Sequence, residues 1–314
     1  MSVVYLRFAA HQPFVAERAP LLEQWLARAD CAASAADWRA QAFHLIAAPT
    51  QGMPPIATAA LRAAGGHAQG TWVCIATPVH LLAGPSGVSM PADGILNLDP
   101  ADADALAEDF NRVFSGAGMR LHRGLGSLLL GSFDAPLRVA AAAPEEVHGD
   151  IWEFLPHGAD AARVRQLMSE IEMWLFEHAV NERRRARAAP AISGLWLWGA
   201  GAADLPLPAA HGWTAGCDPL FAAFGARAQY PSGAGSGVVV LADWPGTAAW
   251  HEAERRWLAP AIADLRSGRL QRLDLSAGRR CFSVSVRGRW RFWRRTQPWW
   301  EAFGMGRVTD GDAD

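Results

Sequence analysis

Apolar side chains recur at steps of three and four residues between positions 160 and 178. This spacing predicts an amphipathic helix whose buried face carries Val164, Leu167, Met168, Ile171, Leu175 and His178. Asp160 stands at the expected N-cap, because a short carboxylate accepts hydrogen bonds from the free amides of a first turn. The helix is expected to end by Ala188-Ala189-Pro190. The apolar run at 194–198 then predicts a buried strand that leads into a turn, Gly199-Ala-Gly201.

Shorter apolar runs alternate with helical patterns along the rest of the chain. Strands are predicted at 3–8, 71–77, 121–130, 136–141 and 237–244, with a hairpin formed by 270–275 and 281–287. Helices are predicted at 20–29, 35–48, 56–64, 101–115, 219–226, 247–267 and 296–303. This alternation predicts an α/β or α+β protein with a mixed sheet flanked by helices.

The composition changes at residues 142–146 (AAPEE), and we place a domain boundary there. The prediction is an N-terminal α/β region at 1–145 and a C-terminal α/β region at 146–305. The C-terminal region carries the long helix and the glycine turn. The acidic end, 306–314, is expected to be disordered.

The composition describes a folded globular protein. Of the 314 residues, 51% are apolar and 19% are charged, and the formal net charge is −2, which is unlike a disordered or generally basic chain. No apolar run approaches the roughly 18 residues that span a bilayer, and the first residues lack the pattern of a signal peptide. The four cysteines are far apart and form no C-x-x-C. We therefore expect a cytoplasmic protein with reduced thiols and no membrane partner.

The chain contains no lysine, so all 29 basic residues are arginine. This excludes a phosphate-loop lysine, a Schiff-base lysine and a lysine general base. Recognition of a phosphate or carboxylate must then use arginine, backbone amides or a metal. The 15 tryptophans against two tyrosines are expected to be mainly core or interface anchors.

A candidate ligand site lies at the end of the long helix. His178, Asn181 and Arg184 are one turn apart and project from one side of a helix. Together with the amides at 199–201 they would suit an anionic ligand. In the alternative interpretation His178 caps the C-terminus of the helix, Asn181 ends it, and Arg184 is a solvated member of the basic run at 183–187.

Metal ligands are sparse. Asp243 ends a predicted strand, and His251 and Glu252 follow one to two helical turns later. No H-x-x-x-H, H-E-x-x-H or C-x-x-C occurs, and no set of four ligands can be assembled. Alternatively, Asp243 is the N-cap of the following helix.

An arginine- and aromatic-rich stretch covers 287–295. As a strand it would place Arg289 and Arg291 on one face, and Trp290 and Phe292 on the other, with Trp293 next in the sequence. Arginines neutralise phosphates and aromatic faces stack on bases, so the stretch is a candidate surface for single-stranded nucleic acid. The alternative is an edge strand whose aromatics pack inward and whose arginines are solvated.

The segments 167–173, 178–184 and 194–201 resemble the signature of the proteobacterial Rpf-type regulatory proteins, many of which are labelled cofactor-independent phosphoglycerate mutases. The stretches at 77–80 and 98–100 add to the resemblance. It implies a degenerate alkaline-phosphatase-like fold with a smaller N-terminal domain. In the family motif an asparagine usually precedes the tryptophan strand; Ser193 stands there in this chain and is included in the candidate ligand site.

The mutases that this family resembles hold two metals with Asp and His clusters and use a serine nucleophile. In this chain the first strand is followed by Ala-Ala-His instead of the Asp-Gly that supplies a metal ligand. Loss of ligands should abolish two-metal phosphoryl transfer. The sequence therefore favours a non-catalytic cytosolic regulatory protein, without cofactor, that binds an anionic metabolite or a protein partner. The alternatives are a phosphoglycerate mutase or phosphatase that uses Mn or Zn, and a nucleic-acid-binding regulator.

Overall fold

The structure, a computed structural model, describes residues 2–8, 17–33, 37–48, 50–66, 70–85, 87–241 and 249–305. The chain divides into two compact units. Unit 1 comprises Met1–Met53 and Pro208–Asp314, and unit 2 comprises Pro54–Leu207. The boundary predicted at 142–146 therefore lies inside unit 2, and the region predicted as 1–145 contains parts of both units. The predicted disordered tail, 306–314, lies outside the described residues.

Unit 1 is built on a six-stranded mixed sheet of order β2-β12-β11-β1-β10-β9. These strands are β2 (Asp30–Ala33), β12 (Arg280–Ser285), β11 (Arg272–Ala277), β1 (Val3–Phe8), β10 (Gly237–Leu241) and β9 (Trp213–Gly216). β1 pairs in parallel with β10 and β11, and the pairings of β12 with β11 and β2 are antiparallel. All six residues of β1 are buried, as a strand covered on both faces requires.

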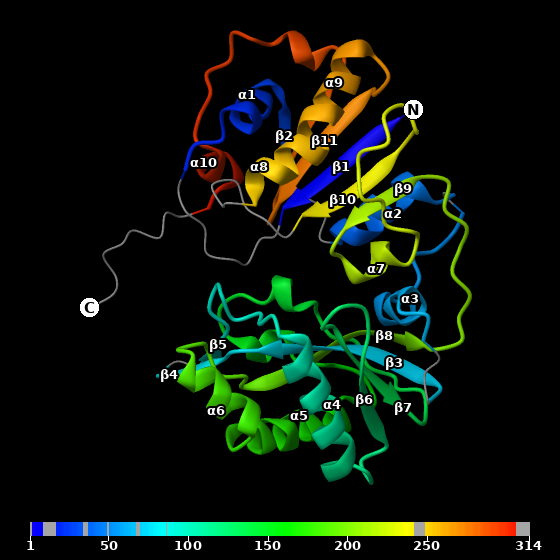
Figure 1. The fold of residues 1–314 in the computed structure, drawn as a ribbon, viewed down its shortest axis with the longest axis vertical. Helices are drawn as coiled ribbons and strands as arrows, with labels where there is room; N and C mark the ends of the chain where they lie inside the picture. The colour runs from blue at the N-terminus through cyan, green and yellow to red at the C-terminus, as the bar shows by residue number, and fades with distance from the viewer. Residues whose placement is uncertain are drawn as a thin grey trace. The chain divides into compact units, whose positions relative to one another are not determined.

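Helices cover both faces of the unit 1 sheet (Figure 1). They are α1 (Pro20–Arg28), α2 (Trp38–Ile46), α7 (Pro219–Ala222), α8 (Trp250–Ala253), the π-helical turn Glu254–Leu258, α9 (Ala259–Ser267) and α10 (Trp299–Phe303). Alternation along β1 decides which side chain meets which helix. Leu6 and Phe8 pack in the core with residues of α1, α9 and α10, whereas Tyr5 stacks on Trp38 of α2 at 6.4 Å.

Unit 2 contains a four-stranded antiparallel sheet of order β6-β7-β3-β8. Its strands are β6 (Met119–Arg123), β7 (Leu129–Phe133), β3 (Trp72–Val79) and β8 (Gly194–Ala202), and a separate hairpin joins β4 (Leu82–Gly84) to β5 (Gly87–Ser89). The stretch predicted as strand at 121–130 contributes to two strands, because the chain turns at 124–128 and returns as β7. The strand predicted at 136–141 is wrong: only the isolated bridge of Ala140 with His157 forms there.

The sheet of unit 2 separates two apolar clusters. Helices lie on both of its faces (Figure 1). They are α3 (Ile56–Ala63), α4 (Pro100–Val113), α5 (Ala161–Phe176) and α6 (Ala179–Ala186), with 3-10 turns at Pro144–Glu146 and Ile151–Phe154. Leu195 and Leu197 of β8 pack with α4 and α5, whereas Trp196 and Trp198 pack with α3. A mixed sheet flanked by helices is therefore confirmed. No helix in the described part of the chain is long and apolar enough to cross a membrane.

Candidate functional site

The predicted long helix is interrupted at His178. α5 ends at Phe176, α6 begins at Ala179, and His178 is the N-cap between them. Its Nδ1 accepts a hydrogen bond from the backbone N–H of Val180 at 3.1 Å, and its Nε2 lies 3.2 Å from Asp109 Oδ2. Burial lowers the pKa of His178 from its usual value, and the carboxylate of Asp109 opposes that shift. These contacts assign the neutral ring with its proton on Nε2, where it can donate to Asp109.

The side chain of Asn181 is hydrogen-bonded to backbone groups. Its Nδ2 donates to the carbonyls of Leu175 at 2.7 Å and Ile192 at 2.9 Å, and its Oδ1 accepts from the N–H of Ile192 at 2.7 Å. The residue is only 2% exposed. One carboxamide thus joins the last turn of α5 to the segment that enters β8.

Arg184 and Ser193 hold the same connecting segment. Arg184 is buried, and its Nε donates to the carbonyl of Pro190 at 2.7 Å. Burial lowers the pKa of this guanidinium, while Asp102 opposes the shift. Ser193 Oγ accepts from the N–H of Leu81 at 3.0 Å. Their polar groups therefore serve the connection between α6 and β8.

Asp160 also differs in detail from its prediction. It occupies the N-cap position of α5, but its side chain makes no capping hydrogen bond there. Its Oδ2 instead accepts from the backbone N–H of Arg138 at 2.7 Å. The carboxylate therefore joins the start of α5 to the preceding loop.

Gly199 and Gly201 lie within β8 rather than in a turn after it. The register of β8 against β3 shifts between Val73 and Ile75, opposite these glycines, and Gly199 has a φ of +63°. A Cβ at Gly201 would lie 2.3 Å from the ring of Pro55. The glycines thus admit the start of α3 on one face of the sheet, whereas Val180 of α6 packs with the cluster on the other face. The structure does not bring the two parts of the predicted anion site together.

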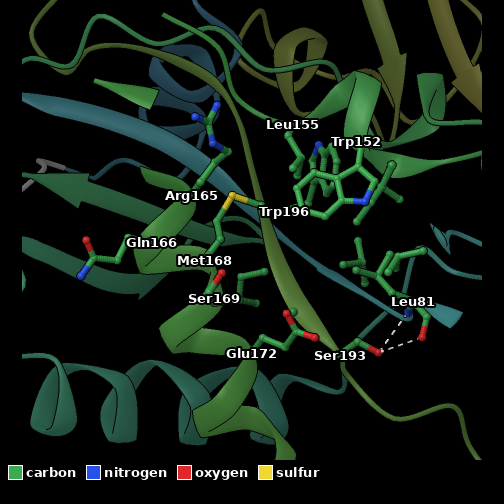
Figure 2. A pocket seen from close by; sticks show the side chains of 15 residues that line it. Leu81, Trp152, Leu155, Arg165, Gln166, Met168, Ser169, Glu172, Ser193 and Trp196 are labelled. Carbon is green, nitrogen blue, oxygen red and sulfur yellow. Dashed lines mark hydrogen bonds between the residues drawn. The ribbon is translucent and has the colours of Figure 1, made fainter. Parts of the chain in front are cut away.

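A cavity that sequence reasoning missed lies beside α5 (Figure 2). It measures about 320 Å³, and its apolar lining comes mainly from Val79, Leu81, Ile151, Leu155, Met168 and Trp196. β8 is an edge strand of the four-stranded sheet, and its first residues form one wall. Trp152 and Leu155 lie at one end in this view, with Glu172 and Ser193 at the other. No local motif marks this cavity, because its walls come from segments far apart in the sequence.

A second cavity of about 620 Å³ continues along the end of α5. It shares Glu172 and Ser193 with the first and is also lined by Met173, Phe176 and Asn181. We call the two cavities together the α5 groove. Two of the predicted ligand residues, Asn181 and Ser193, therefore do line a cavity, although their polar atoms bind the backbone.

The arginines and glutamates that line the α5 groove differ in their hydrogen bonding. Arg165 donates to the carbonyl of Pro156 at 2.7 Å, and Arg185 donates to the carbonyl of Phe176 at 3.3 Å. Within the described ranges, neither Glu172 nor Glu177 has a hydrogen bond or an ion pair with a side chain. The groove therefore contains two carboxylates without a side-chain partner, which can pair with a cationic ligand.

The metal candidates do not form a site in the part of the chain that the structure describes. Asp243 falls outside the described residues. His251 is exposed on α8, and Glu252 is paired with Arg255 and with Arg256. No group of three or more His, Cys, Asp or Glu side chains among the described residues is placed to hold a metal ion. Within the described ranges, His251 and Glu252 therefore do not form the two-metal centre that the resemblance implies.

The strand predicted at 287–295 is wrong. Gly288–Trp290 forms a 3-10 turn, and the following residues are irregular up to α10. Arg289 and Arg291 therefore do not share a strand face. Each binds a different part of unit 1, the end of α9 and Asp30 respectively.

Comparison with known proteins gives similarity to solved structures only, since no family model and no curated protein matches. One similar structure is a cofactor-independent phosphoglycerate mutase from Thermoplasma acidophilum DSM 1728, at 12% identity and a TM-score of 0.36, covering 90% of this chain and 89% of that one. Another is the PH0037 protein from Pyrococcus horikoshii, at 11% identity and a TM-score of 0.41, covering 90% of this chain and 87% of that one. Similarity at this level transfers no activity to the chain.

Proposed function

We propose that the chain is a non-catalytic binding protein whose α5 groove holds a segment of a protein partner. The occupant is a peptide segment with apolar anchor residues and basic side chains. The observation that carries the proposal is the exposed apolar rim of the groove. Trp152 is 66% exposed, Met173 is 69% exposed and Phe176 is 77% exposed.

The rim supplies the free energy for association. Fully burying one large apolar side chain contributes about 1.5–3 kcal/mol. Because about 0.7 of each of these three side chains is exposed, covering them would contribute roughly 3–6 kcal/mol before the entropic costs of association. Exposed apolar side chains gathered beside a cavity are typical of interaction surfaces.

The carboxylates of the α5 groove favour a partner segment with basic side chains. Glu172 lies between the two cavities and Glu177 lines the second, while the nearby arginines Arg165 and Arg185 bind backbone carbonyls. A basic segment would place its cations beside these two glutamates. An acidic segment or a phosphorylated metabolite would be repelled by these two carboxylates.

The polar side chains of the segment 178–184 have structural roles, and this argues against catalysis. His178, Asn181 and Arg184 make hydrogen bonds that hold α5, α6 and the approach to β8. A side chain that is committed in this way cannot bind substrate without breaking the connection that it makes. We therefore expect no mutase or phosphatase turnover when the purified protein is assayed with added Mn.

Fluorescence anisotropy with labelled synthetic peptides tests the proposal. The probes are peptides of about 14 residues that carry leucines at several spacings, each made with either lysine or glutamate at the remaining positions. At least one lysine peptide should bind, and its glutamate counterpart should not. Trp152→Ala and Phe176→Ala should each weaken binding roughly tenfold. Leu125→Ala is the matched control, because Leu125 is also an exposed apolar residue of unit 2 but does not line the groove.

Two outcomes would overturn the proposal. One is that no lysine peptide binds, or that Trp152→Ala and Phe176→Ala weaken binding no more than Leu125→Ala does. The other is turnover in the Mn assay together with stoichiometric bound metal, which would restore the enzyme interpretation. Glu172→Gln adds a check on charge, since it should weaken the lysine peptide and reduce the dependence of its binding on salt.

A further inference from the structure

The loop at 287–295, between β12 and α10 of unit 1, exposes its aromatic residues and fixes its arginines. We call this segment the aromatic loop. Trp290 is 63% exposed, Phe292 is 73% exposed and Trp293 is 69% exposed. The sequence-based alternative, in which the aromatics pack inward and the arginines are solvated, is the reverse of this arrangement.

Arginines attach the loop to the body of unit 1. Arg289 Nη1 donates to the carbonyl of Leu265 at 2.9 Å and also to the carbonyl of Arg266, in the last turn of α9. A cation at this position satisfies free carbonyls and complements the helix dipole. Arg294 Nη1 donates to the carbonyl of Ala29 at 2.8 Å. The backbone of the loop is thereby held in place without burial of its three aromatic side chains.

The aromatic rings present open faces. Phe292 and Trp293 meet edge to face, with ring centroids 5.5 Å apart and an interplanar angle of 78°. In this geometry the edge of one ring covers part of one face of the other, and the remaining ring faces stay open because neither ring lies flat on the other. The Arg289 guanidinium lies 5.1 Å from the centroid of Trp290, so a cation already contacts one ring.

The surroundings of the aromatic loop are positively charged. The loop contains five arginines and no acidic residue. Asp30 is shared by Arg291 and Arg294, and no ion pair is found within the described ranges for Arg287 or Arg295.

The positive charge extends beyond the loop. Arg28 and Arg266 contact the same tryptophan, Trp25, at 4.9 Å and 5.5 Å from its ring centroid. The Arg266 carbonyl is bound by Arg289, which joins this pair of cations to the aromatic loop. Cations and open aromatic faces therefore lie together on one surface of unit 1.

We propose that the aromatic loop binds single-stranded nucleic acid. Bases would stack on Trp290, Phe292 and Trp293, and phosphates would pair with Arg287 and Arg295. Stacking on aromatic side chains beside a cationic surface is the way in which proteins bind single strands without reading sequence. This binding site goes beyond the proposed function, and it belongs to the other unit of the chain.

The chemistry of the aromatic loop favours a nucleic acid over a lipid surface. The loop is not an amphipathic helix, which is the usual form of an interfacial anchor. Its exposed apolar groups are all aromatic, and no leucine, isoleucine or methionine occurs between 287 and 295. Flat rings suit bases, whereas insertion into acyl chains is usually shared with aliphatic side chains.

Anisotropy of labelled oligonucleotides of about 10 nucleotides, one of deoxythymidine and one of uridine, tests the proposal with the full chain at about 50 mM salt. Trp290→Ala and Trp293→Ala should each weaken binding roughly tenfold, and Trp293→Phe should retain most of it. Arg287→Gln combined with Arg295→Gln should lower the slope of log K against log salt by roughly 1.4, the value for two phosphates of a single strand.

The controls come from unit 2. Leu125→Ala removes an exposed apolar residue and Arg120→Gln removes an exposed arginine, both outside the aromatic loop and the α5 groove, and neither should alter binding. Three outcomes would overturn the proposal. They are no binding of either oligonucleotide, binding unchanged by Trp290→Ala and Trp293→Ala in folded protein, and binding to phosphatidylserine vesicles in place of oligonucleotides. Binding of only one oligonucleotide supports the proposal and identifies whether the ligand is DNA or RNA.

Discussion

Replacing Asn181 with alanine separates a structural role from a ligand-binding one. The side chain makes three hydrogen bonds, to the carbonyls of Leu175 and Ile192 and to the N–H of Ile192. A buried hydrogen bond contributes about 1 kcal/mol net, and each backbone group left without a partner costs about 1–3 kcal/mol. Asn181→Ala should therefore lower the free energy of unfolding of unit 2 by about 3–5 kcal/mol. The melting temperature of that unit should fall by roughly 10 °C.

Urea denaturation followed by circular dichroism measures this loss, and two other asparagines of unit 2 calibrate it. Asn111 is half-buried and makes two hydrogen bonds with Leu121, at 2.7 Å and 2.8 Å, so Asn111→Ala should cost about 1–3 kcal/mol. Asn97 is exposed, and Asn97→Ala should stay within about 0.5 kcal/mol of the wild type. If Asn181→Ala behaves like Asn97→Ala, the structural account is refuted and Asn181 returns as a ligand residue.

Two further predictions concern the same region. Gly201→Ala should destabilise unit 2 by about 1–3 kcal/mol in thermal melts, because its Cβ would lie 2.3 Å from the Pro55 ring, whereas Gly116→Ala has open space and should be near neutral. Burial lowers the pKa of His178 in the folded state, so its contribution to stability is present above the unfolded value of 6.5 and is lost as the pH falls through the folded pKa. Wild type should therefore lose stability relative to His178→Asn, which keeps an N-cap but does not titrate, as the pH is lowered below 6.5. Equal losses in the two proteins would contradict this assignment.

Local periodicity was enough to predict most of the individual elements. The run at 3–8 is β1, and the hairpin predicted at 270–287 is β11 and β12. In the described residues, the predicted helix at 247–267 corresponds to α8, the π-helical turn and α9, and Gly268 follows it with a φ of +80°. These elements follow from side-chain spacing and turn residues that lie close together in the sequence.

Features that depend on distant contacts were not predictable in the same way. The glycines at 199 and 201 look like a turn, but Pro55 approaches one of them from α3 and keeps both inside β8. The alternating pattern at 287–295 looks like a strand, but the side chain of Arg289 donates a hydrogen bond to a carbonyl at the end of α9. The α5 groove has no sequence signature, because β8, α5 and the turn at Ile151–Phe154 build it together. In each case a tertiary contact overrides the local pattern.

The division of the chain has a consequence for its synthesis on the ribosome. β1 is made before its partners β10 and β11, which begin at Gly237 and Arg272, so the strand remains unpaired while more than two hundred residues are translated. During that time its apolar VVYLRF sequence lacks both neighbours and is a target for chaperones or for aggregation. Unit 2 is complete once Leu207 has emerged. Unit 2, whose synthesis begins after that of β1, is therefore the first of the two units that can fold completely.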